Sequence, residues 1–415
     1  MKVELPTDQK AAAKPRLVRV IGRLNVGGPA RQACVLQEQL ATDFECYLIA
    51  GALAEGEQDM GYLLASENNV FRLRAMAREI SLWSDAIAFW KILAFLRRVR
   101  PAVVHTHTAK AGALGRVAAW MARVPVRIHS YHGNVFHGYF SPFKTRIYLA
   151  IERLLGRLTT HVVVIAESQR RDICDRYRVV PGNKVSVINN GFDLQHSSDV
   201  SRAEARTRLG LSLNDFVAVW AGRMAPVKDV GLLGEMIRKA AETGSRIYFV
   251  IVGDGSEKSR LLQIVENCDN VRCLGWRKDM DVIWNAADVA ILTSVNEGTP
   301  TSLIEAMAAG VPFVSTDVGS VRDLASGPLQ ELLDGMGFKA GNGFFTPRLP
   351  EAMLSCIQIL EGDPTMKALM GATGKAFVRE RFSIQRLVDD LKSLYLEQIQ
   401  ESGGIATHTP VANTG

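Results

Sequence analysis

The chain has 415 residues, of which 47% are hydrophobic and 22% are charged. This length is too great for one ordinary core and suits two domains, and the composition excludes a core that depends on disulfides or structural metals. The formal net charge of +6 is unevenly distributed, because residues 1–193 hold 27 Lys and Arg against 16 Asp and Glu, whereas the remainder holds 22 against 27.

The basic first half indicates an anionic partner, such as a phosphate-bearing acceptor, nucleic acid or an anionic lipid surface, and a merely solvated basic face is the alternative. The six cysteines form no CxxC pair, and the first residues lack the apolar run of a signal peptide. We therefore expect a cytoplasmic protein. The most apolar helical stretch, residues 86–96, is far shorter than the roughly 20 residues that cross a bilayer.

Short apolar runs alternate with longer amphipathic segments in both halves, a pattern typical of parallel strands joined by crossover helices. In chain order, strands are expected over residues 17–21, 46–50, 102–105, 126–129, 161–165, 216–221, 247–252, 271–274, 289–292 and 313–315. The pattern predicts an α/β protein with two doubly wound, Rossmann-like domains. In such sheets ligands bind beyond the carboxyl ends of the strands.

A polar stretch without strand character, residues 195–208, separates the two halves. The polar segments at the two ends of the chain are unlikely to pack. The predicted division is a disordered tail over 1–15, a first domain over 16–193, a second over 194–382, a helix over 383–400 that crosses back to the first, and a disordered tail over 401–415.

The segment Glu297-Gly-Thr-Pro-Thr-Ser-Leu-Ile-Glu305 follows one predicted strand and leads into a helix expected over 301–309. Thr299 is the expected N-cap and Pro300 the expected first helical residue. The amides at this helix start, from Gly298 to Thr301, predict an anion site for a diphosphate. Glu297 and Glu305 bracket that site and can accept hydrogen bonds from sugar and ribose hydroxyls, although solvation or helix-dipole pairing also explains a carboxylate pair alone.

The segment Ala221-Gly-Arg-Met-Ala-Pro-Val-Lys228 follows the first strand of the second half and places Arg223 and Lys228 at the same sheet edge. Two fixed cations there can neutralise the charge on a departing nucleoside diphosphate, whereas capping of a surface loop is the alternative. The Gly253-Asp-Gly255 turn is interpreted as structural.

In this order and spacing, these motifs resemble the large retaining glycosyltransferase family 4, and in particular bacterial cell-surface polysaccharide transferases. The resemblance implies the GT-B fold, with two domains facing a cleft. It also implies that Arg223 and Lys228 hold the diphosphate of a nucleotide-sugar donor, that Glu305 holds the ribose and that Glu297 holds the transferred sugar. We expect a UDP-sugar rather than a GDP-sugar. Asp229 stands where the family usually has glycine, which leaves the geometry after Lys228 open.

The first half would bind the acceptor in this family. The loop Asn25-Val-Gly-Gly-Pro-Ala-Arg31 resembles the family's glycine loop, in which Gly27 and Gly28 let backbone amides approach the donor phosphates. His132, before Gly133, resembles the family's active-site histidine. The segment His105-Thr-His-Thr-Ala-Lys110 resembles the His-Thr-His-Thr-x-Lys segment of bacterial cell-surface polysaccharide transferases. The acceptor candidates are therefore His105, His107, Lys110 and the loop residue His137. A mainly structural role is expected for His129.

No Cys or His pair has zinc-finger spacing, no HExxH occurs, and no Asp-x-Asp is a convincing metal ligand. We therefore expect no metal and no cofactor, and a glycan or polyprenyl-lipid-linked acceptor rather than nucleic acid. Front-face substitution is favoured over a covalent carboxylate intermediate, because the glycine and histidine loops of the first half offer no carboxylate. A nucleotide-sugar epimerase and a non-catalytic nucleotide-sugar-binding regulator are the rival functions.

The segment 142–157 interleaves basic and apolar residues at helical spacing. Its apolar residues Phe143, Ile147, Leu154 and Leu155 face either a domain core or an anionic lipid surface. In the second case the protein would bind peripherally to the inner face of the cell membrane.

Overall fold

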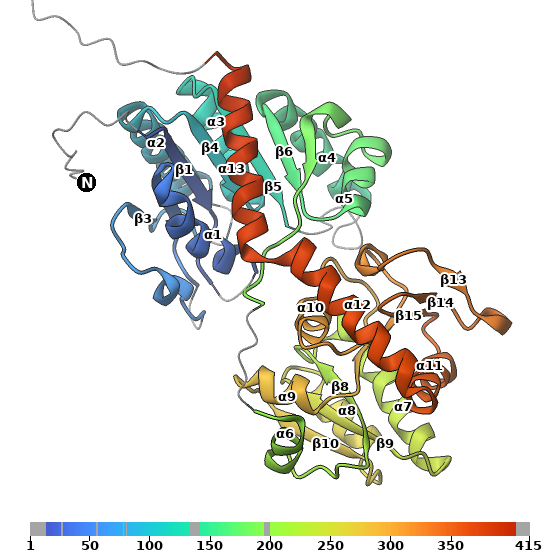
Figure 1. Ribbon diagram of the computed structural model, residues 1–415. Helices are drawn as coiled ribbons and strands as arrows, with labels where there is room; N and C mark the ends of the chain where they lie inside the picture. The colour runs from blue at the N-terminus through green and yellow to red at the C-terminus, as the bar shows by residue number, and fades with distance from the viewer. Residues whose placement is uncertain are drawn as a thin grey trace, which may run out of the picture. The chain divides into compact units, whose positions relative to one another are not determined.

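The computed structural model describes residues 14–25, 28–54, 57–77, 79, 81–132, 142–194 and 200–403. The chain forms two compact units, each with its own sheet (Figure 1). Unit 1 comprises the chain up to Ile165, residues Gln169–Asn190 and the chain from Leu387, and unit 2 comprises Ala166–Ser168 and Gly191–Arg386. The predicted tails lie mostly outside the described residues.

The sheet of unit 1 has the order β3-β2-β1-β4-β5-β6-β7, and all its neighbouring strands are parallel. The five predicted strands are present, with two short additional ones, β3 and β7. The bounds are β1 Arg16–Ile21, β2 Glu45–Gly51, β3 Val70–Leu73, β4 Val103–His107, β5 Val126–Tyr131, β6 His161–Val164 and β7 Val185–Val187. The prediction missed β3 because only one of its four residues is buried.

Right-handed crossovers place α1 on one face of this sheet and α2, α3 and α4 on the other. Helix α13 repeats apolar residues at helical spacing, and these form its buried side, with Tyr395 contacting Phe44 edge to face. An ion pair of 2.6 Å between Lys392 and Asp43 fixes the same helix. The bounds are α1 Gly28–Gln39, α2 Leu82–Val99, α3 Ala109–Met121, α4 Pro142–Leu158, α5 Glu167–Arg171 and α13 Ile384–Glu401.

The sheet of unit 2 has the order β10-β9-β8-β11-β12-β15-β14-β13, and all its neighbouring strands are parallel except that β14 runs antiparallel to both β15 and β13. The strands are β8 Phe216–Ala221, β9 Ile247–Val252, β10 Val271–Gly275, β11 Val289–Leu292, β12 Phe313–Thr316, β13 Gln330–Glu331, β14 Phe338–Ala340 and β15 Gly343–Thr346. The helices are α6 Arg202–Arg208, α7 Val230–Glu242, α8 Lys258–Ile264, α9 Met280–Ala286, α10 Thr301–Ala308, α11 Pro350–Gly362 and α12 Pro364–Phe382.

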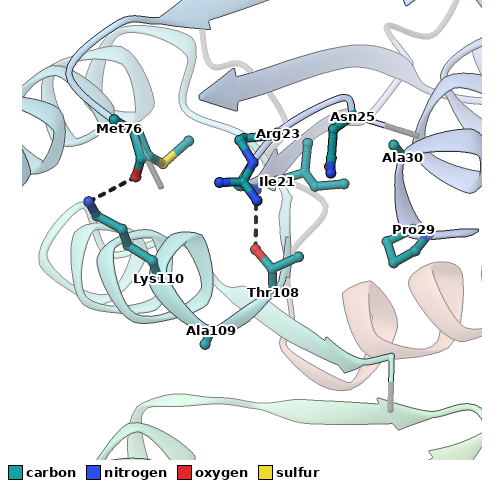
Figure 2. A pocket seen from close by; sticks show the side chains of 11 residues that line it. Ile21, Arg23, Asn25, Pro29, Ala30, Met76, Thr108, Ala109 and Lys110 are labelled. Carbon is teal, nitrogen blue, oxygen red and sulfur yellow. Dashed lines mark hydrogen bonds between the residues drawn. The ribbon is translucent and has the colours of Figure 1, made fainter. Parts of the chain in front are cut away.

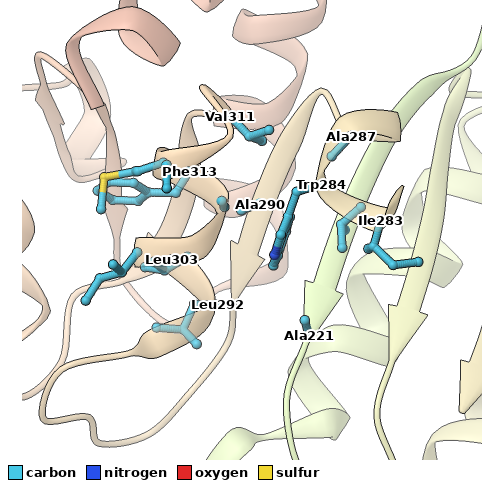
Figure 3. Close-up of a cluster of buried hydrophobic side chains, with 14 of the residues drawn as sticks. Ala221, Ile283, Trp284, Ala287, Ala290, Leu292, Leu303, Val311 and Phe313 are labelled. Carbon is cyan, nitrogen blue, oxygen red and sulfur yellow. The ribbon is translucent and has the colours of Figure 1, made fainter. Parts of the chain in front are cut away.

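The central strands β8, β9 and β11 are buried on both faces, so they consist of nearly continuous apolar runs. One core lies between the sheet and helices α9 and α10, where Trp284 and Leu303 pack with Ala290 of β11 (Figure 3). These contacts hold β8 and β11 beside each other and thereby place the loops that follow them. None of the described helices has the combined length and apolarity that a membrane crossing requires.

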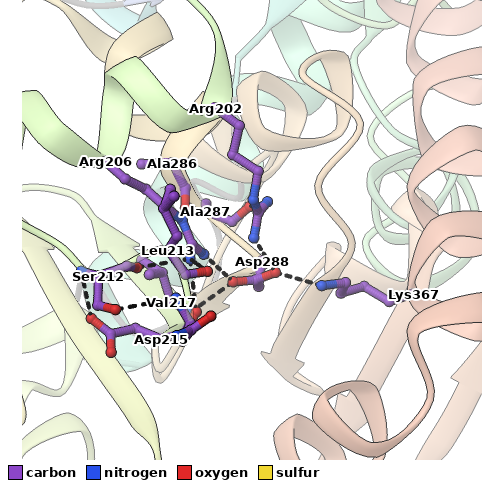
Figure 4. A network of polar contacts seen from close by, with 11 residues as sticks. Arg202, Arg206, Ser212, Leu213, Asp215, Val217, Ala286, Ala287, Asp288 and Lys367 are labelled. Atoms are coloured by element: carbon purple, nitrogen blue, oxygen red, sulfur yellow. Dashed lines mark hydrogen bonds and ion pairs between the residues drawn. The ribbon is translucent and has the colours of Figure 1, made fainter.

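A buried carboxylate, Asp288, stands directly before β11 (Figure 4). Its oxygens accept hydrogen bonds from buried Arg206 at 2.6 Å and from the Val217 amide at 2.9 Å, and Arg202 and Lys367 complete the network. Burial raises the pKa of Asp288, but the hydrogen bonds from Lys367 and Val217 and the charge of Arg202 outweigh burial and leave the pKa below its ordinary value. The network joins α6, β8, β11 and α12.

Candidate active site

The predicted donor residues of unit 2 all lie after parallel strands. Residues 222–228 follow β8, the Gly-Asp-Gly turn follows β9, and residues 293–300 follow β11. Because the three strands are parallel neighbours in one sheet, their carboxyl ends meet at one edge. The motifs that the sequence separates by up to about 70 residues therefore converge.

Lys228 and Glu297 contact each other directly. The Lys228 Nζ lies 2.5 Å from the Glu297 Oε1, and the Ser294 hydroxyl donates to the same oxygen at 2.6 Å. The Lys228 carbonyl accepts a hydrogen bond from Thr293 at 2.8 Å. Both charged side chains are mostly buried, with 19% and 13% of their surfaces exposed. The site therefore holds a cation and an anion in direct contact, each with a small part of its surface exposed.

Arg223 lies in the same loop but differs from Lys228 in its surroundings. Its side chain is exposed, and no ion pair or hydrogen bond ties it to another described residue. An exposed guanidinium at the carboxyl edge of the sheet is available to an anionic ligand.

Asp229 adopts the left-handed conformation that favours glycine, with φ of 46°. Its carboxylate accepts from the Leu232 amide at 3.2 Å and so caps helix α7, and it also pairs with Arg348. The cap and the ion pair offset the backbone strain. Asp229 therefore adopts a conformation that glycine also favours and stabilises the turn after Lys228 through its own carboxylate.

The start of helix α10 corrects one sequence prediction. Pro300, not Thr299, is the N-cap, and no side chain caps the helix. Because no side chain hydrogen-bonds the first amides of the helix, including that of Thr301, these amides can receive an anion. A Cβ added at Gly298 would meet nothing within 4 Å, so internal packing does not require glycine there. Glu305 lies half-buried in the second turn.

Two glycines allow the backbones of the site loops to approach each other closely. A Cβ on Gly253 would lie 1.8 Å from the Gly222 carbonyl oxygen, and φ at Gly253 is +135°. A Cβ on Gly319, at φ of +56°, would lie 2.1 Å from the Glu297 carbonyl oxygen. The Gly-Asp-Gly turn thus supports the Arg223 loop, as its structural interpretation implies. The sequence pattern did not predict roles for Gly319 and Ser294, and the only sequence feature that marks them is their position after a strand.

A cavity of about 220 Å³ lies at the corresponding edge of unit 1 (Figure 2). Arg23 and Asn25 line it from the loop after β1, and Thr108 and Lys110 line it from the start of α3. Thr108 has φ of +66°, a strained value for a β-branched residue, and accepts a hydrogen bond from the Gly22 amide at 3.2 Å. Such strain concentrates at functional sites, and no sequence pattern predicted it at Thr108.

The structure corrects the prediction for His105. Strand β4 extends to His107, and His105 is fully buried with both ring nitrogens occupied, by Tyr395 of α13 at 2.6 Å and by Ser130 at 2.7 Å. It cannot contact an acceptor and instead joins α13 to the sheet. His129 is also buried and bonds to Thr106 at 2.9 Å, in keeping with a structural role.

His107 and His132 form a pair at the ends of β4 and β5, with His107 Nδ1 lying 2.9 Å from His132 Nε2. The outer nitrogens, His107 Nε2 and His132 Nδ1, are buried and have no partner in the described part of the chain. Burial lowers the pKa of His132 to about 4 and that of His107 well below its ordinary value, so both imidazoles are neutral near pH 7. A neutral pair can exchange a hydrogen bond with a hydroxyl.

Lys110 lines the cavity, but its ammonium is already engaged. It pairs with Asp85 of α2 and donates to the Ala77 carbonyl at 3.0 Å. Gly28 begins helix α1, and a Cβ there would meet nothing within 4 Å. Gly27 and His137 lie outside the described residues. Among the residues that are described, no three His, Cys, Asp or Glu side chains gather as metal ligands would.

Comparisons with known proteins identify the class of enzyme. A family model described as Glycosyltransferase Family 4 matches residues 26–196, and one described as Glycosyl transferases group 1 matches residues 215–358. The UDP-Gal:alpha-D-GlcNAc-diphosphoundecaprenol alpha-1,3-galactosyltransferase of Escherichia coli is 28% identical over 341 residues, covering 79% of this chain and 84% of its own. The capsular polysaccharide biosynthesis glycosyltransferase CapM of Staphylococcus aureus is 25% identical, covering 81% of this chain and 88% of its own.

Among solved structures, that of HepE from Anabaena in complex with UDP superposes with a TM-score of 0.74 at 20% identity, covering 92% of this chain and all of that one. Sucrose-phosphate synthase from Thermosynechococcus elongatus gives 0.73 at 18% identity, with 94% and 100% covered. The fold and these matches together define an enzyme of the GT-B class, a glycosyltransferase. The chain carries a glycosyltransferase family 4 domain followed by a glycosyl transferases group 1 domain, and its relatives include bacterial polysaccharide glycosyltransferases.

Proposed function

We propose that this enzyme moves a hexose or related sugar from a UDP-sugar to a glycan or polyprenyl-lipid-linked acceptor, with retention of the anomeric configuration, on the inner face of the cell membrane. The observation that carries the donor half of the proposal is the Lys228–Glu297 pair, held beside exposed Arg223 and the uncapped start of α10. Cations for a diphosphate and a carboxylate for sugar hydroxyls occupy one sheet edge.

In the proposed complex, Arg223, Lys228 and the amides at the start of α10 bind the diphosphate. Lys228 then exchanges part of its contact with Glu297 for a phosphate oxygen, and Glu297 accepts hydrogen bonds from the transferred sugar. Glu305 binds the ribose. A Cβ added at Gly298 would meet nothing within 4 Å, which leaves room for a donor to approach the backbone closely.

The relatives support the nature of the substrates. The Escherichia coli relative is named for a UDP-Gal donor and a diphosphoundecaprenol-linked acceptor, and HepE was solved with UDP. We infer the same classes here, a UDP-sugar rather than a GDP-sugar, and an acceptor that binds at the cavity between Arg23 and Thr108. His132 and His107 would orient its attacking hydroxyl, and both are neutral and each has one buried ring nitrogen to spare.

Retention would follow from front-face substitution. The leaving phosphate takes the proton of the acceptor hydroxyl while the hydroxyl oxygen attacks the anomeric carbon from the side that UDP leaves. Arg223 and Lys228 stabilise the charge that develops on UDP, so the reaction would need no divalent ion and no cofactor.

One experiment tests this proposal and its rivals together. The protein is incubated with labelled UDP-sugars and a bacterial membrane lipid extract, with and without EDTA, and the product is analysed by chromatography and NMR. We expect an α-linked product from an α-linked donor, at the same rate with EDTA. Conversion of the donor sugar alone would show an epimerase, binding alone a regulator, and loss of transfer that Mg²⁺ restores a metal-dependent enzyme.

A further inference from the structure

Helix α4 has two apolar faces, only one of which is needed by the core. Leu149 and Leu155 are buried against unit 1. On the opposite side Phe143, Ile147, Ile151 and Leu154 recur every three or four residues and are all exposed, Phe143 by 71% and Leu154 by 58%. Of the two environments that the sequence left open, the core therefore takes Leu155 but not these four residues, which we call the α4 stripe.

The charged residues of α4 also divide between an exposed and a buried side. Lys144, Arg146, Arg153 and Arg157 are exposed, and at 100° per residue they flank the α4 stripe on both sides. The one acid of the helix, Glu152, is buried, where it accepts two hydrogen bonds from Arg116 of α3 at 2.9 and 3.1 Å and one from Tyr131 at 2.5 Å. This buried contact fixes the rotation of α4 and holds the stripe outward.

The neighbouring helices continue this surface. Helices α2, α3 and α4 cover the same face of the sheet, and α3 contacts both of the others. Leu82, Trp83, Ile87 and Trp90 of α2 and Trp120 of α3 are exposed, Trp83 by 85%. The three helices contain nine Lys and Arg and two Asp and Glu, and both acids are ion-paired within the layer, Asp85 with Lys110 and Glu152 with Arg116. The layer therefore combines exposed aromatic residues with a positive charge.

A cavity of about 660 Å³ opens at the edge of the α4 stripe. Arg153, Arg157 and Arg178 line it, together with Asp175. Arg153 is held in place by a hydrogen bond of 2.7 Å to the Tyr177 carbonyl. Guanidinium groups beside an apolar stripe are suited to phosphate headgroups whose acyl chains lie next to them.

We propose that the α4 stripe, with its flanking cations and the aromatic residues of α2 and α3, seats unit 1 on an anionic lipid bilayer. Apolar residues enter the interface, tryptophans lie at headgroup depth, and the cations contact the phosphates. This inference rests on the proposed lipid-linked acceptor, because docking here would bring unit 1 to the surface in which such an acceptor is anchored. The favourable charge identifies lipid rather than a second copy, since two such faces would repel each other.

The test is sedimentation of the full chain, without substrate, with vesicles of phosphatidylcholine alone or mixed with phosphatidylglycerol. We expect binding only to the anionic vesicles, with release as salt rises. Each basic side chain near an anionic leaflet strengthens partitioning about fivefold, so Lys144→Glu with Arg146→Glu should weaken it at least about 25-fold. Ile147→Ser with Ile151→Ser should also weaken binding, with the salt dependence retained.

The matched control is Arg238→Glu with Arg246→Glu, which changes net charge equally at exposed positions of unit 2 and should bind vesicles nearly as the wild type does. The inference is wrong if the wild type stays in the supernatant at low salt, or if the α4 variant and the control bind equally. It is also wrong if the stripe variant instead converts a dimer into a monomer. Calorimetric titration with UDP, without vesicles, reports on the donor site separately, so failure of membrane docking and failure of the proposed function are distinguishable.

Discussion

Replacing Lys228 by alanine tests the two roles proposed for the Lys228–Glu297 pair, which are binding of the diphosphate by Lys228 and binding of the transferred sugar by Glu297. In the free enzyme the two groups are 2.5 Å apart and mostly buried. The variant loses a charged contact to the diphosphate worth about 1.5 to 3 kcal/mol, which corresponds to a loss of about 10- to 150-fold in UDP affinity. It also leaves Glu297 with Ser294 as a partner but without a counter-charge. That carboxylate further repels the phosphate, so we expect the upper part of the range.

The complementary change, Glu297→Gln, should act in the opposite direction on UDP. A phosphate oxygen bound to Lys228 would lie about 5 Å from the carboxylate, and at an effective dielectric constant near 20 the repulsion is about 3 kcal/mol, an upper bound for a site that solvent reaches. Removing that charge frees Lys228, and we expect UDP to bind about tenfold more tightly. Sugar transfer should still be lost, because the amide no longer accepts strongly from the sugar hydroxyls.

Isothermal titration calorimetry with UDP and a transfer assay with the UDP-sugar measure the two effects. Arg223→Ala serves as a comparison that should weaken UDP binding without disturbing Glu297, and Arg238→Ala is the control for loss of an exposed cation on unit 2. The reasoning fails if Lys228→Ala leaves UDP affinity unchanged. It also fails if Glu297→Gln weakens UDP binding as much as Lys228→Ala does.

Three further predictions concern stability. Asp288→Asn should lower the free energy of unfolding in urea by about 3 kcal/mol or more, because it leaves buried Arg206 without its counter-charge. Since the pKa of Asp288 is lowered in the folded state, this deficit should be full at neutral pH and shrink as the pH falls through the folded pKa, and a deficit that grows in acid would contradict it. With a folded pKa of about 4, His132 should lower stability as the pH falls from about 6.5 towards 4, since the unfolded state then binds more protons. His132→Gln should remove that share of the acid slope, and identical slopes in the two proteins would refute the assignment. Gly253→Ala should cost at least about 2 kcal/mol and abolish UDP binding, whereas Gly244→Ala, at φ of +65° in open space, should cost about 1 kcal/mol; equal melting temperatures would argue against the close approach to Gly222.

The sequence was sufficient to predict that the proposed donor motifs meet at one sheet edge, because each motif directly follows an apolar run. Parallel strands of one sheet end at one edge, so Lys228 after β8 and Glu297 after β11 had to converge, although 69 residues separate them. The same reasoning could not find Ser294 or Gly319. Their roles depend on which backbone atoms approach them, as the Glu297 carbonyl approaches Gly319, and no periodicity records such a contact.

The local sequence pattern could not distinguish the roles of His105 and His107. His105 and His107 are two residues apart on β4 and so point to the same side of the sheet, but Tyr395, 290 residues further along the chain, covers one of them. The return of α13 to unit 1 therefore made His105 structural, whereas the pairing of β4 with β5 brought His107 beside His132.

Helix α4 illustrates the same division. Its sequence alone established an amphipathic helix with both basic and apolar residues, because helical spacing fixes which side chains share a face. The sequence did not determine which face the core covers, since two apolar faces were available. The buried contact of Glu152 with Arg116 and Tyr131 made that choice, because a carboxylate is stable in the interior only where a cation and hydrogen-bond donors meet it, and this requirement turned the α4 stripe towards solvent.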